Sequence, residues 1–351
     1  MMRMKRIIAF AAALFLLPML LQTADSAELS DSAVSAIVTD ADSGRVLYEK
    51  NADERCLIAS TTKIMTGYLA CRYADPEQVL DVPAEAVGVE GSSVYLQPGE
   101  RVSVRMLLYG TMLQSGNDAA TALAAAVSGD VGSFVALMND TAQQLGMHRT
   151  HYANPHGLDS EENYSTARDL ATLTAAALQE PLFAQVVACK SASFGKRSFV
   201  NHNKLLWRCE GAIGVKTGYT TAAGRILVSA VRRGGRTLIA VTLNDRDDWN
   251  DHMRLYDSLF SSAKETAAAV SGQPIMTVRL AAEGKRQVEL LAAEDVQCLL
   301  FPGETLSFRF YPYAIPFAPT EYGESAGVAA ICADGREVAR VPVAWGATVL
   351  R

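Results

Sequence analysis

Residues 225–243 read RILVSAVRRGGRTLIAVTL and contain the strongest indication of the fold. Two apolar runs rich in β-branched residues, 225–232 and 236–243, flank Gly234-Gly235, and such a pair accepts the positive φ angles of a tight hairpin turn. Another apolar run precedes them at 213–217. These three runs predict neighbouring β-strands, the last two joined as a hairpin.

A second hairpin is expected near the N-terminus, where short apolar runs over 34–40 and 45–50 surround the turn Asp42-Ser43-Gly44. Between the two sets of strands, the apolar residues follow helical spacing. We therefore expect an antiparallel sheet closed by N- and C-terminal strands, with a helical cluster beside it. The predicted helices cover residues 60–73, 103–113, 117–128, 130–145, 166–179 and 249–262.

The sequence changes character after Gly272, where strand-like runs alternate with turns that contain proline and glycine. This pattern predicts a small all-β domain over residues 272–351, after a larger domain over residues 28–271. The expected fold class is therefore α+β. The expected strands of the second domain cover residues 276–280, 287–291, 305–310, 327–333 and 337–343.

Residues 1–27 have the order of a secretory signal peptide. Arg3, Lys5 and Arg6 form a basic start, residues 7–21 are apolar, and small or polar residues follow. A membrane span needs about 20 apolar residues, so the run is short for an uncleaved anchor, which remains the alternative. We expect export and an extracytoplasmic location, either secreted or associated with the cell envelope.

The composition is that of a globular protein, because 49% of the 351 residues are hydrophobic and 20% are charged. The formal net charge of -6 provides no general attraction for nucleic acid. The six cysteines lack CxxC spacing and form no zinc-like cluster with histidine, so we expect neither a metal nor a cofactor. Most are expected to be buried thiols, with a Cys189–Cys209 disulfide as the alternative.

Ser60-Thr61-Thr62-Lys63 is the first motif with chemical potential. On a helix, Ser60 and Lys63 would share a face about one turn apart. A serine hydroxyl is a weak nucleophile and needs a neighbouring base, and a lysine is a base only if burial or nearby positive charge lowers its pKa. A lone SxxK string is common on solvated surfaces and predicts little by itself.

Two further motifs offer polar groups suited to the same cleft. Ser115-Gly116-Asn117 places a hydroxyl and a carboxamide around a flexible glycine, although either polar residue would also suit a helix N-cap. Lys216-Thr217-Gly218 ends a strand-like run and offers a charge and a hydroxyl to a substrate carboxylate, with a glycine that permits close approach. It would otherwise be an ordinary strand end with a turn glycine.

These motifs belong to six ordered stretches, namely residues 59–63 (ASTTK), 98–100 (PGE), 115–119 (SGNDA), 154–158 (NPHGL), 164–169 (YSTARD) and 214–220 (GVKTGYT). The order SxxK, SxN and KTG resembles that of penicillin-binding proteins and serine β-lactamases. The longer stretches resemble D-alanyl-D-alanine carboxypeptidases, and this similarity covers nearly all of residues 28–345. It implies a β-lactamase/transpeptidase-like domain followed by a small β-rich domain.

The resemblance also implies an activity, namely hydrolysis of the terminal D-alanyl-D-alanine bond of a peptidoglycan stem pentapeptide. Ser60 would be the nucleophile and Lys63 the general base that takes its proton. Ser115 would relay a proton to the leaving D-alanine, and Asn117 would hold the substrate amide and Lys63. β-Lactam antibiotics would acylate the same serine.

The remaining roles implied by the resemblance concern substrate binding. Lys216 and Thr217 would bind the terminal carboxylate, and Gly218 would let the substrate approach the strand. The backbone N–H groups of Ser60 and Tyr219 would form the oxyanion hole.

Three histidine or serine features receive smaller roles. His202 matches a position near the family's carboxylate site and is a candidate for substrate binding, although a lone loop histidine is more often structural. His156 is expected to brace the loop beneath the site. The string Gly323-Glu324-Ser325-Ala326-Gly327 has the spacing of a nucleophile elbow, but no histidine follows His252, so a turn is expected there.

Two other functions share this scaffold. A serine β-lactamase of class A would need an E-x-x-L-N loop, which residues 150–180 lack. A non-catalytic peptidoglycan-binding protein would not need the intact motifs. Members of the resembled family commonly end in an amphipathic helix on the membrane, whereas residues 345–351 follow closely on the β-rich part. We therefore expect a free enzyme or one tethered by its N-terminus, and peripheral membrane association stays open.

Overall fold

The computed structural model describes residues 29–280, 287–316 and 318–350, so the expected signal peptide lies outside the described residues. The first part of the chain is built on a five-stranded antiparallel sheet in the order β2-β1-β11-β10-β9. The predicted N-terminal hairpin therefore shares a sheet with the later strands, as expected. The strands are β1 (Ser35–Asp40), β2 (Val46–Lys50), β9 (Ala212–Thr220), β10 (Gly224–Arg233) and β11 (Arg236–Leu243).

The hairpin between β10 and β11 confirms the sequence prediction. Arg233 pairs with Arg236, and Gly234 and Gly235 between them have φ angles of 53° and 74°. Only glycine adopts two successive positive φ angles without a steric penalty. Every residue of β11 is buried, which is consistent with the near-continuous apolar run in the sequence and requires cover on both faces of the sheet.

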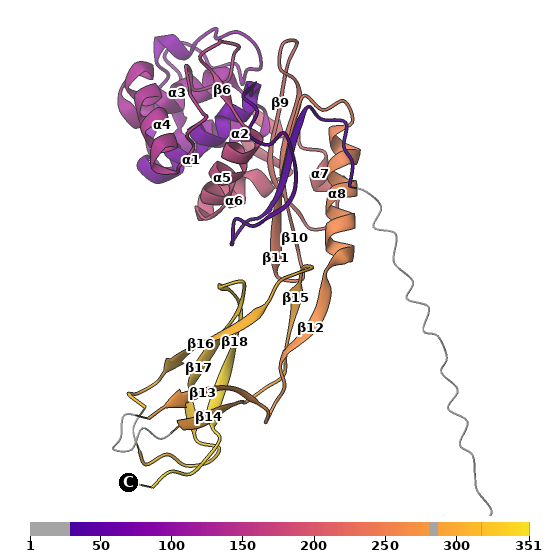
Figure 1. Ribbon diagram of the computed structural model, residues 1–351. Helices are drawn as coiled ribbons and strands as arrows, with labels where there is room; N and C mark the ends of the chain where they lie inside the picture. The colour runs from indigo at the N-terminus through magenta and orange to yellow at the C-terminus, as the bar shows by residue number, and fades with distance from the viewer. Residues whose placement is uncertain (1–28, 281–286, 317, 351) are drawn as a thin grey trace, which may run out of the picture.

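Helices provide that cover on both faces (Figure 1). One face packs against α5 and α6 and, beyond them, the rest of the helical cluster, while α8 covers the other face. Buried apolar side chains form one cluster on the side of the helices and a second between the sheet and α8. The helices are α1 (Lys63–Tyr73), α2 (Val104–Leu113), α3 (Asn117–Ser128), α4 (Val131–Gln144), α5 (Ala167–Leu178), α6 (Pro181–Ala188), α7 (Leu205–Arg208) and α8 (Asp248–Ser262).

Polar side chains begin three of these helices. Ser103 accepts a hydrogen bond from Met106 N at the start of α2, and Asp130 and Thr166 make the corresponding bonds at the starts of α4 and α5. Such N-caps satisfy backbone N–H groups that have no partner within the helix. They explain why these three predicted helices begin within one residue of the expected position.

The first predicted helix differs in a way that matters for the site. Residues Ala59–Thr62 form a 3₁₀ turn, η1, and the α-helix begins only at Lys63. A 3₁₀ turn has three residues per turn, so side chains at positions i and i+3 are eclipsed. The side chains of Ser60 and Lys63 therefore lie one above the other more directly than they would on an α-helix.

Several short elements were not predicted, because runs this short show no clear periodicity. They include the helices α6 and α7 already given. The others are η2 (Ala84–Ala86), the pair β3 (Cys56–Leu57) with β6 (Tyr164–Ser165), the pair β4 (Val79–Asp81) with β5 (Arg101–Ser103), the hairpin β7 (Ser191–Phe194) with β8 (Arg197–Val200), and the pair β12 (Lys264–Ala269) with β15 (Val296–Leu300).

The C-terminal part is rich in strands, as expected, and has its own hydrophobic cluster. Its main sheet is antiparallel in the order β13-β14-β18-β17-β16, and the separate pair β12–β15 leads into it from the end of α8 (Figure 1). The separate cluster supports a second domain, and the division at residues 271–272 stays a prediction. The strands are β12 (Lys264–Ala269), β13 (Pro274–Arg279), β14 (Gln287–Ala292), β15 (Val296–Leu300), β16 (Leu306–Pro312), β17 (Ser325–Ala333) and β18 (Arg336–Trp345).

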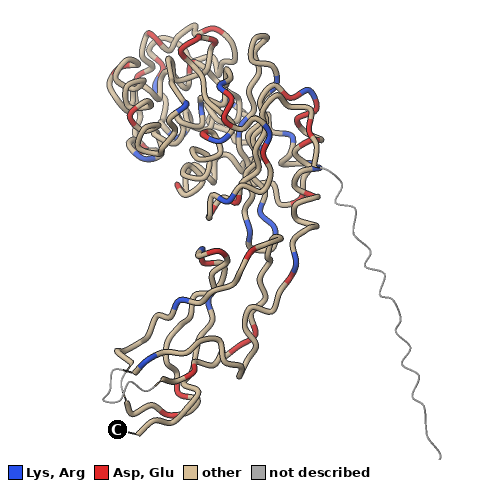
Figure 2. The backbone as a smooth tube through the Cα atoms, in the orientation of Figure 1, with Lys and Arg blue, Asp and Glu red and all other residues tan. Residues whose placement is uncertain are grey.

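Three further observations concern the cysteines, the distribution of charge and the helices that could span a membrane. All six cysteines are free thiols, so the alternative of a Cys189–Cys209 disulfide is wrong. Acidic and basic residues are interspersed along both parts of the chain (Figure 2). Within the described ranges no single helix is long and apolar enough to cross a membrane, although the sharply bent pairs α3–α4 and α5–α6 meet the length and composition criteria together.

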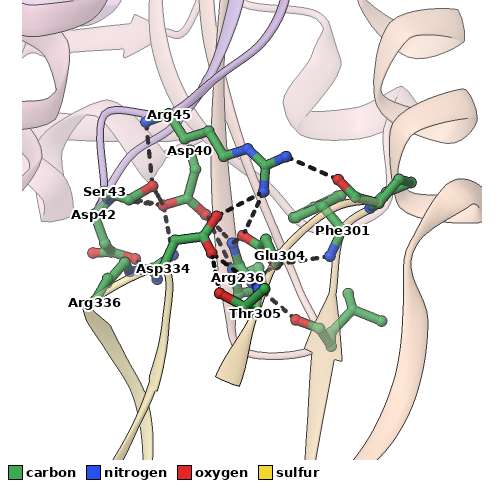
Figure 3. Close-up of polar contacts among 12 residues, drawn as sticks. Asp40, Asp42, Ser43, Arg45, Arg236, Phe301, Glu304, Thr305, Asp334 and Arg336 are labelled. Atoms are coloured by element: carbon green, nitrogen blue, oxygen red, sulfur yellow. Dashed lines mark hydrogen bonds and ion pairs between the residues drawn. The ribbon is translucent and has the colours of Figure 1, made fainter. Parts of the chain in front are cut away.

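A buried ion network joins the two parts of the chain (Figure 3). Arg236 at the start of β11 donates to the carboxylates of Asp40, at 2.8 Å, and Glu304, at 2.7 Å, and all three side chains are almost fully buried. Its guanidinium also lies 4.8 Å from the centroid of the Phe301 ring. Arg336 of β18 donates to the other oxygen of Asp40 at 2.5 Å. Asp40 thus bridges an arginine from each part.

Replacing Arg236 with Met should destabilise the protein by about 3–5 kcal/mol, because the buried carboxylates of Asp40 and Glu304 each lose a directly hydrogen-bonded cation, although Arg336 still contacts Asp40. Urea unfolding of the variant and the wild type measures the difference. The matched control is Arg309→Met on the exposed surface of β16, which should leave stability unchanged. An Arg236→Met protein as stable as the wild type would contradict this account of the junction.

Candidate active site

The predicted site residues converge on one cleft of about 290 Å³. Ser60 comes from η1, Ser115 from the turn between α2 and α3, and Thr217 from β9, which is the edge strand of the sheet. Gly218, Tyr219 and His202 line the same cleft. Lys63, Asn117 and Lys216 are buried side chains that hydrogen-bond to one another or to the hydroxyls lining it.

Lys63 is fully buried and surrounded by three oxygen atoms. Its Nζ lies 3.0 Å from Ser60 Oγ and 2.7 Å from Asn117 Oδ1, and it also donates to the backbone carbonyl of His156. The amide of Asn117 is oriented by its own Nδ2, which donates to the carbonyl of Glu90 at 2.6 Å. Asn117 Oδ1 is therefore the amide atom that faces the lysine.

The hydrogen-bond pattern around Lys63 also accommodates a neutral amine. The carbonyl oxygens of Asn117 and His156 can only accept, so together they use two N–H groups of the lysine. A neutral amine has just two N–H groups and one lone pair, which leaves the lone pair for the Ser60 hydroxyl. That arrangement is the one needed to remove the hydroxyl proton.

Electrostatics act in the same direction. Burial lowers the pKa of Lys63 well below its usual value, and the charge of Lys216 lowers it further, while Asp118 opposes both effects. Burial also lowers the pKa of Lys216, to about 7. Because the charge of Lys216 contributes to the lowering of the Lys63 pKa, the protonation states of the two amines are coupled.

Lys216 and Ser115 form a second polar pair. Lys216 Nζ donates to Ser115 Oγ at 3.1 Å and to the carbonyl of Thr217 at 2.9 Å. Ser115 has a φ of 61°, a left-handed conformation that is uncommon for any residue other than glycine. Such strain is usually retained where a side chain must point in a particular direction, here toward Lys216.

The turn that carries Ser60 requires glycine next to it. Ala59 has a φ of 44°, and a Cβ atom added to Gly157 would lie 1.9 Å from the Ala59 carbonyl oxygen. Gly218 approaches from the other side, where an added Cβ would lie 3.3 Å from Ser60 N. A side chain has no room at Gly157 and would be tightly packed at Gly218, so both glycines allow their segments to lie close against the backbone around the serine.

Asp118 is a site residue that the sequence analysis quoted but did not assign. Its buried carboxylate accepts hydrogen bonds from Val94 N at 3.0 Å, Leu96 N at 3.0 Å and Ser93 Oγ at 2.6 Å. These bonds hold residues 90–96, whose Ser92 lines the cleft. The sequence does contain a signal that Asp118 belongs to the site, because Asp118 directly follows the SxN motif.

Arg225, Asp248 and Trp249 also line the cleft and were missed entirely. Arg225 lies opposite Tyr219 in the β9–β10 pairing and donates to Asp248 Oδ1 at 2.6 Å. Its guanidinium is 6.0 Å from the centroid of the Trp249 ring. Sequence spacing could not find this group, because it depends on the strand register and on the packing of α8.

The histidines have structural surroundings, and so does the competing string at residues 323–327. The turn there ends at Gly323 and Ser325 begins strand β17, so the turn expected over the whole string is wrong. His156 Nδ1 accepts from Leu158 N at 3.2 Å, and burial together with Lys63 lowers its pKa to about 4, so it braces its loop as expected. Burial, and then the charge of Lys216, lower the pKa of His202. Ser229 and His252 do form a serine–histidine pair at 2.7 Å, but both are fully buried in the core.

A serine aligned with a buried lysine at the edge of an antiparallel sheet defines a serine-type enzyme of the penicillin-binding class. The comparisons with known proteins agree. The sequence profile of the Peptidase S11 family, described as D-alanyl-D-alanine carboxypeptidase, matches residues 22–247. The chain therefore belongs to the Peptidase S11 family.

Individual relatives extend the similarity beyond that range. D-alanyl-D-alanine carboxypeptidase DacF of Bacillus subtilis is 30% identical over 91% of this chain and 86% of the relative. DacC of Escherichia coli is 33% identical over 88% and 82%. The crystal structure of penicillin binding protein 5 from Haemophilus influenzae aligns with a TM-score of 0.68 at 28% identity, covering 92% of this chain and 98% of that one.

The two lysines should be coupled in the pH profile of acylation. A neutral Lys63 is needed to accept the Ser60 proton, so the rate falls on the acid side as Lys63 becomes protonated. In Lys216→Gln the neighbouring charge is lost, the pKa of Lys63 rises, and this acid limb should move to higher pH. The second-order rate constant for labelling by a fluorescent penicillin, measured as a function of pH, shows the pH at which this acid limb lies.

Lys196→Gln is the matched control, because this lysine is exposed on the β7–β8 hairpin. Its profile should follow that of the wild type. An acid limb at the same pH in wild type and Lys216→Gln would show that the two amines are not coupled.

Proposed function

We propose that this chain hydrolyses the terminal D-alanyl-D-alanine bond of peptidoglycan stem peptides through an acyl-enzyme on Ser60. The observation that carries the proposal is the buried Lys63 amine, 3.0 Å from Ser60 Oγ and otherwise satisfied by two carbonyl acceptors. The membership of the Peptidase S11 family supports the choice of substrate.

Acylation begins when Lys63 Nζ takes the Ser60 proton and Ser60 Oγ attacks the carbonyl carbon of the penultimate D-alanine. The backbone N–H groups of Ser60 and Tyr219 donate to the developing oxyanion, where one such donor contributes about 3–4 kcal/mol. The C–N bond then breaks, and the proton that Lys63 took goes to the leaving amine, with Ser115, which contacts Lys216, as the relay. Water then attacks the ester and gives one proton to Lys63, which returns it to Ser60 Oγ as the ester C–O bond breaks.

Substrate binding uses the free edge of β9. An extended peptide can add its backbone to an exposed strand edge, and Asn117 Nδ2, which donates one N–H to Glu90, keeps its second N–H for the substrate amide. At the far end, Lys216 and Thr217 bind the terminal carboxylate, whose negative charge in turn favours the protonated form of Lys216. His202 is close enough to Lys216 for the charge of that lysine to lower its pKa, and Arg225, which is paired with Asp248, lines the same cleft.

Penicillin-type compounds belong to the same proposal, because their strained amide places a carbonyl and a carboxylate where the peptide has them. The structural similarity to penicillin binding protein 5 supports it. Fast deacylation of a β-lactam would favour the alternative of a serine β-lactamase. The enzyme would act outside the cytoplasm, where peptidoglycan lies, and the family membership supports that location.

The direct test is to incubate the protein with a pentapeptide ending in D-Ala-D-Ala and to quantify released D-alanine. Wild type should release it, and Ser60→Ala should lose release and penicillin labelling. Lys63→Ala should keep its fold yet lose both by at least about a hundredfold, because the serine then has no base. Lys216→Ala should mainly raise KM.

Three results would reject parts of this proposal. Normal labelling of Lys63→Ala would remove the lysine from the base role. A folded wild-type protein that is neither labelled nor active would favour a non-catalytic peptidoglycan-binding protein. Rapid multiple turnover of nitrocefin would instead favour the β-lactamase.

A further inference from the structure

A second hollow of about 500 Å³ adjoins the active-site cleft. Its lining comes from the segment between β8 and the end of α7: Val200, Asn201, His202, Lys204, Trp207 and Arg208. His202 is the residue that this hollow shares with the cleft. The two cavities are therefore neighbours, and one side chain belongs to the walls of both.

The surface of this hollow is apolar in part and basic around it. Trp207 is 50% exposed and Val200 is 56% exposed, so two apolar side chains in the lining of this hollow face the solvent. Lys190 lies with its Nζ 5.8 Å from the centroid of the Trp207 ring, and Lys204 and Arg208 are exposed in the lining. Among the described residues, none of these three cations forms a salt bridge with a carboxylate.

The position of the hollow relates it to the leaving group. In the proposed mechanism, the substrate carboxylate lies at Lys216 and Thr217, and this carboxylate belongs to the amino acid that leaves. His202 lines both the cleft and the hollow, and it is close enough to Lys216 for the charge of that lysine to lower its pKa. The methyl side chain of D-alanine is far too small to fill 500 Å³, so a larger leaving group is needed to reach this surface.

We propose that this hollow is a subsite for the leaving group, and that it accepts an aliphatic or peptide arm that carries a second carboxylate. This inference rests on the proposed function and specifies its substrate class. The arm would lie on Trp207, and its distal carboxylate would meet Lys204 and Arg208. Crosslinked peptides, in which the leaving amine is part of a larger acidic chain, have this chemistry.

The chemical step is the same as for D-alanine. Ser60 Oγ forms an ester with the penultimate D-alanine carbonyl, the amide C–N bond breaks, and the leaving amine takes the proton. Water then hydrolyses the ester. Only the size and charge of the departing amine differ, so no further reactant is needed.

Three N-acylated tripeptides with the same acyl part test the subsite. One ends in D-Ala-D-Ala, one ends in D-Ala-D-2-aminopimelate, and one ends in D-Ala-D-2-aminoheptanoate, which has the same stem without the distal carboxylate. Trp207→Ala should lower kcat/KM about tenfold for both long leaving groups and less than about twofold for D-alanine. The double variant Lys204→Ala/Arg208→Ala should lower it about fivefold for the aminopimelate peptide alone.

Trp207→Phe keeps an aromatic surface and should retain most of the activity on the long leaving groups, while thermal unfolding shows that each variant is folded. Equal losses on all three peptides, or no loss on the long ones, would overturn the subsite while D-alanine release leaves the proposed function intact. A wild type that neither releases D-alanine nor binds penicillin would overturn both.

Discussion

A primary amine held out of water among three oxygen atoms is the constraint on which the site depends. Taking an ammonium ion out of water is expensive, and two carbonyl acceptors do not provide a formal counter-charge. Lys63 is in that position, and the charge of the neighbouring Lys216 repels a protonated Lys63 and so lowers its pKa further. The neutral amine is therefore the favoured state, and a neutral amine beside a serine is a base.

The rest of the fold holds that amine in place. The 3₁₀ turn η1 aligns Ser60 with Lys63, and the loop around Gly157 passes so close to Ala59 that no side chain fits between them. Asn117 is oriented through Glu90, and Asp118 secures the segment that follows. On the opposite side, the long hairpin β10–β11 supports the edge strand β9. These residues are distant in sequence, and they meet because the sheet and the helical cluster pack against each other.

Much of this could be predicted from sequence, and the failures have physical reasons. The Gly234-Gly235 hairpin and the capped helices were predictable because turn and cap residues act locally. The three motifs pointed to one cleft because their order is unusual. By contrast, the start of α1 was misplaced because helical spacing does not distinguish a 3₁₀ turn from an α-turn. Arg225 and Trp249 reach the cleft only through strand register and helix packing, and the cations around Trp207 are brought together by tertiary structure.

The most direct measurement is the titration of the Lys63 Nζ itself by NMR, in protein carrying isotope-labelled lysine, with the resonance assigned by Lys63→Arg. This account predicts that the amine titrates well below the usual pKa of lysine, near 10.4, and that it is neutral at the pH where Ser60 reacts. A Lys63 amine that stays protonated up to the usual lysine value would contradict the account, because the serine would then have no base beside it.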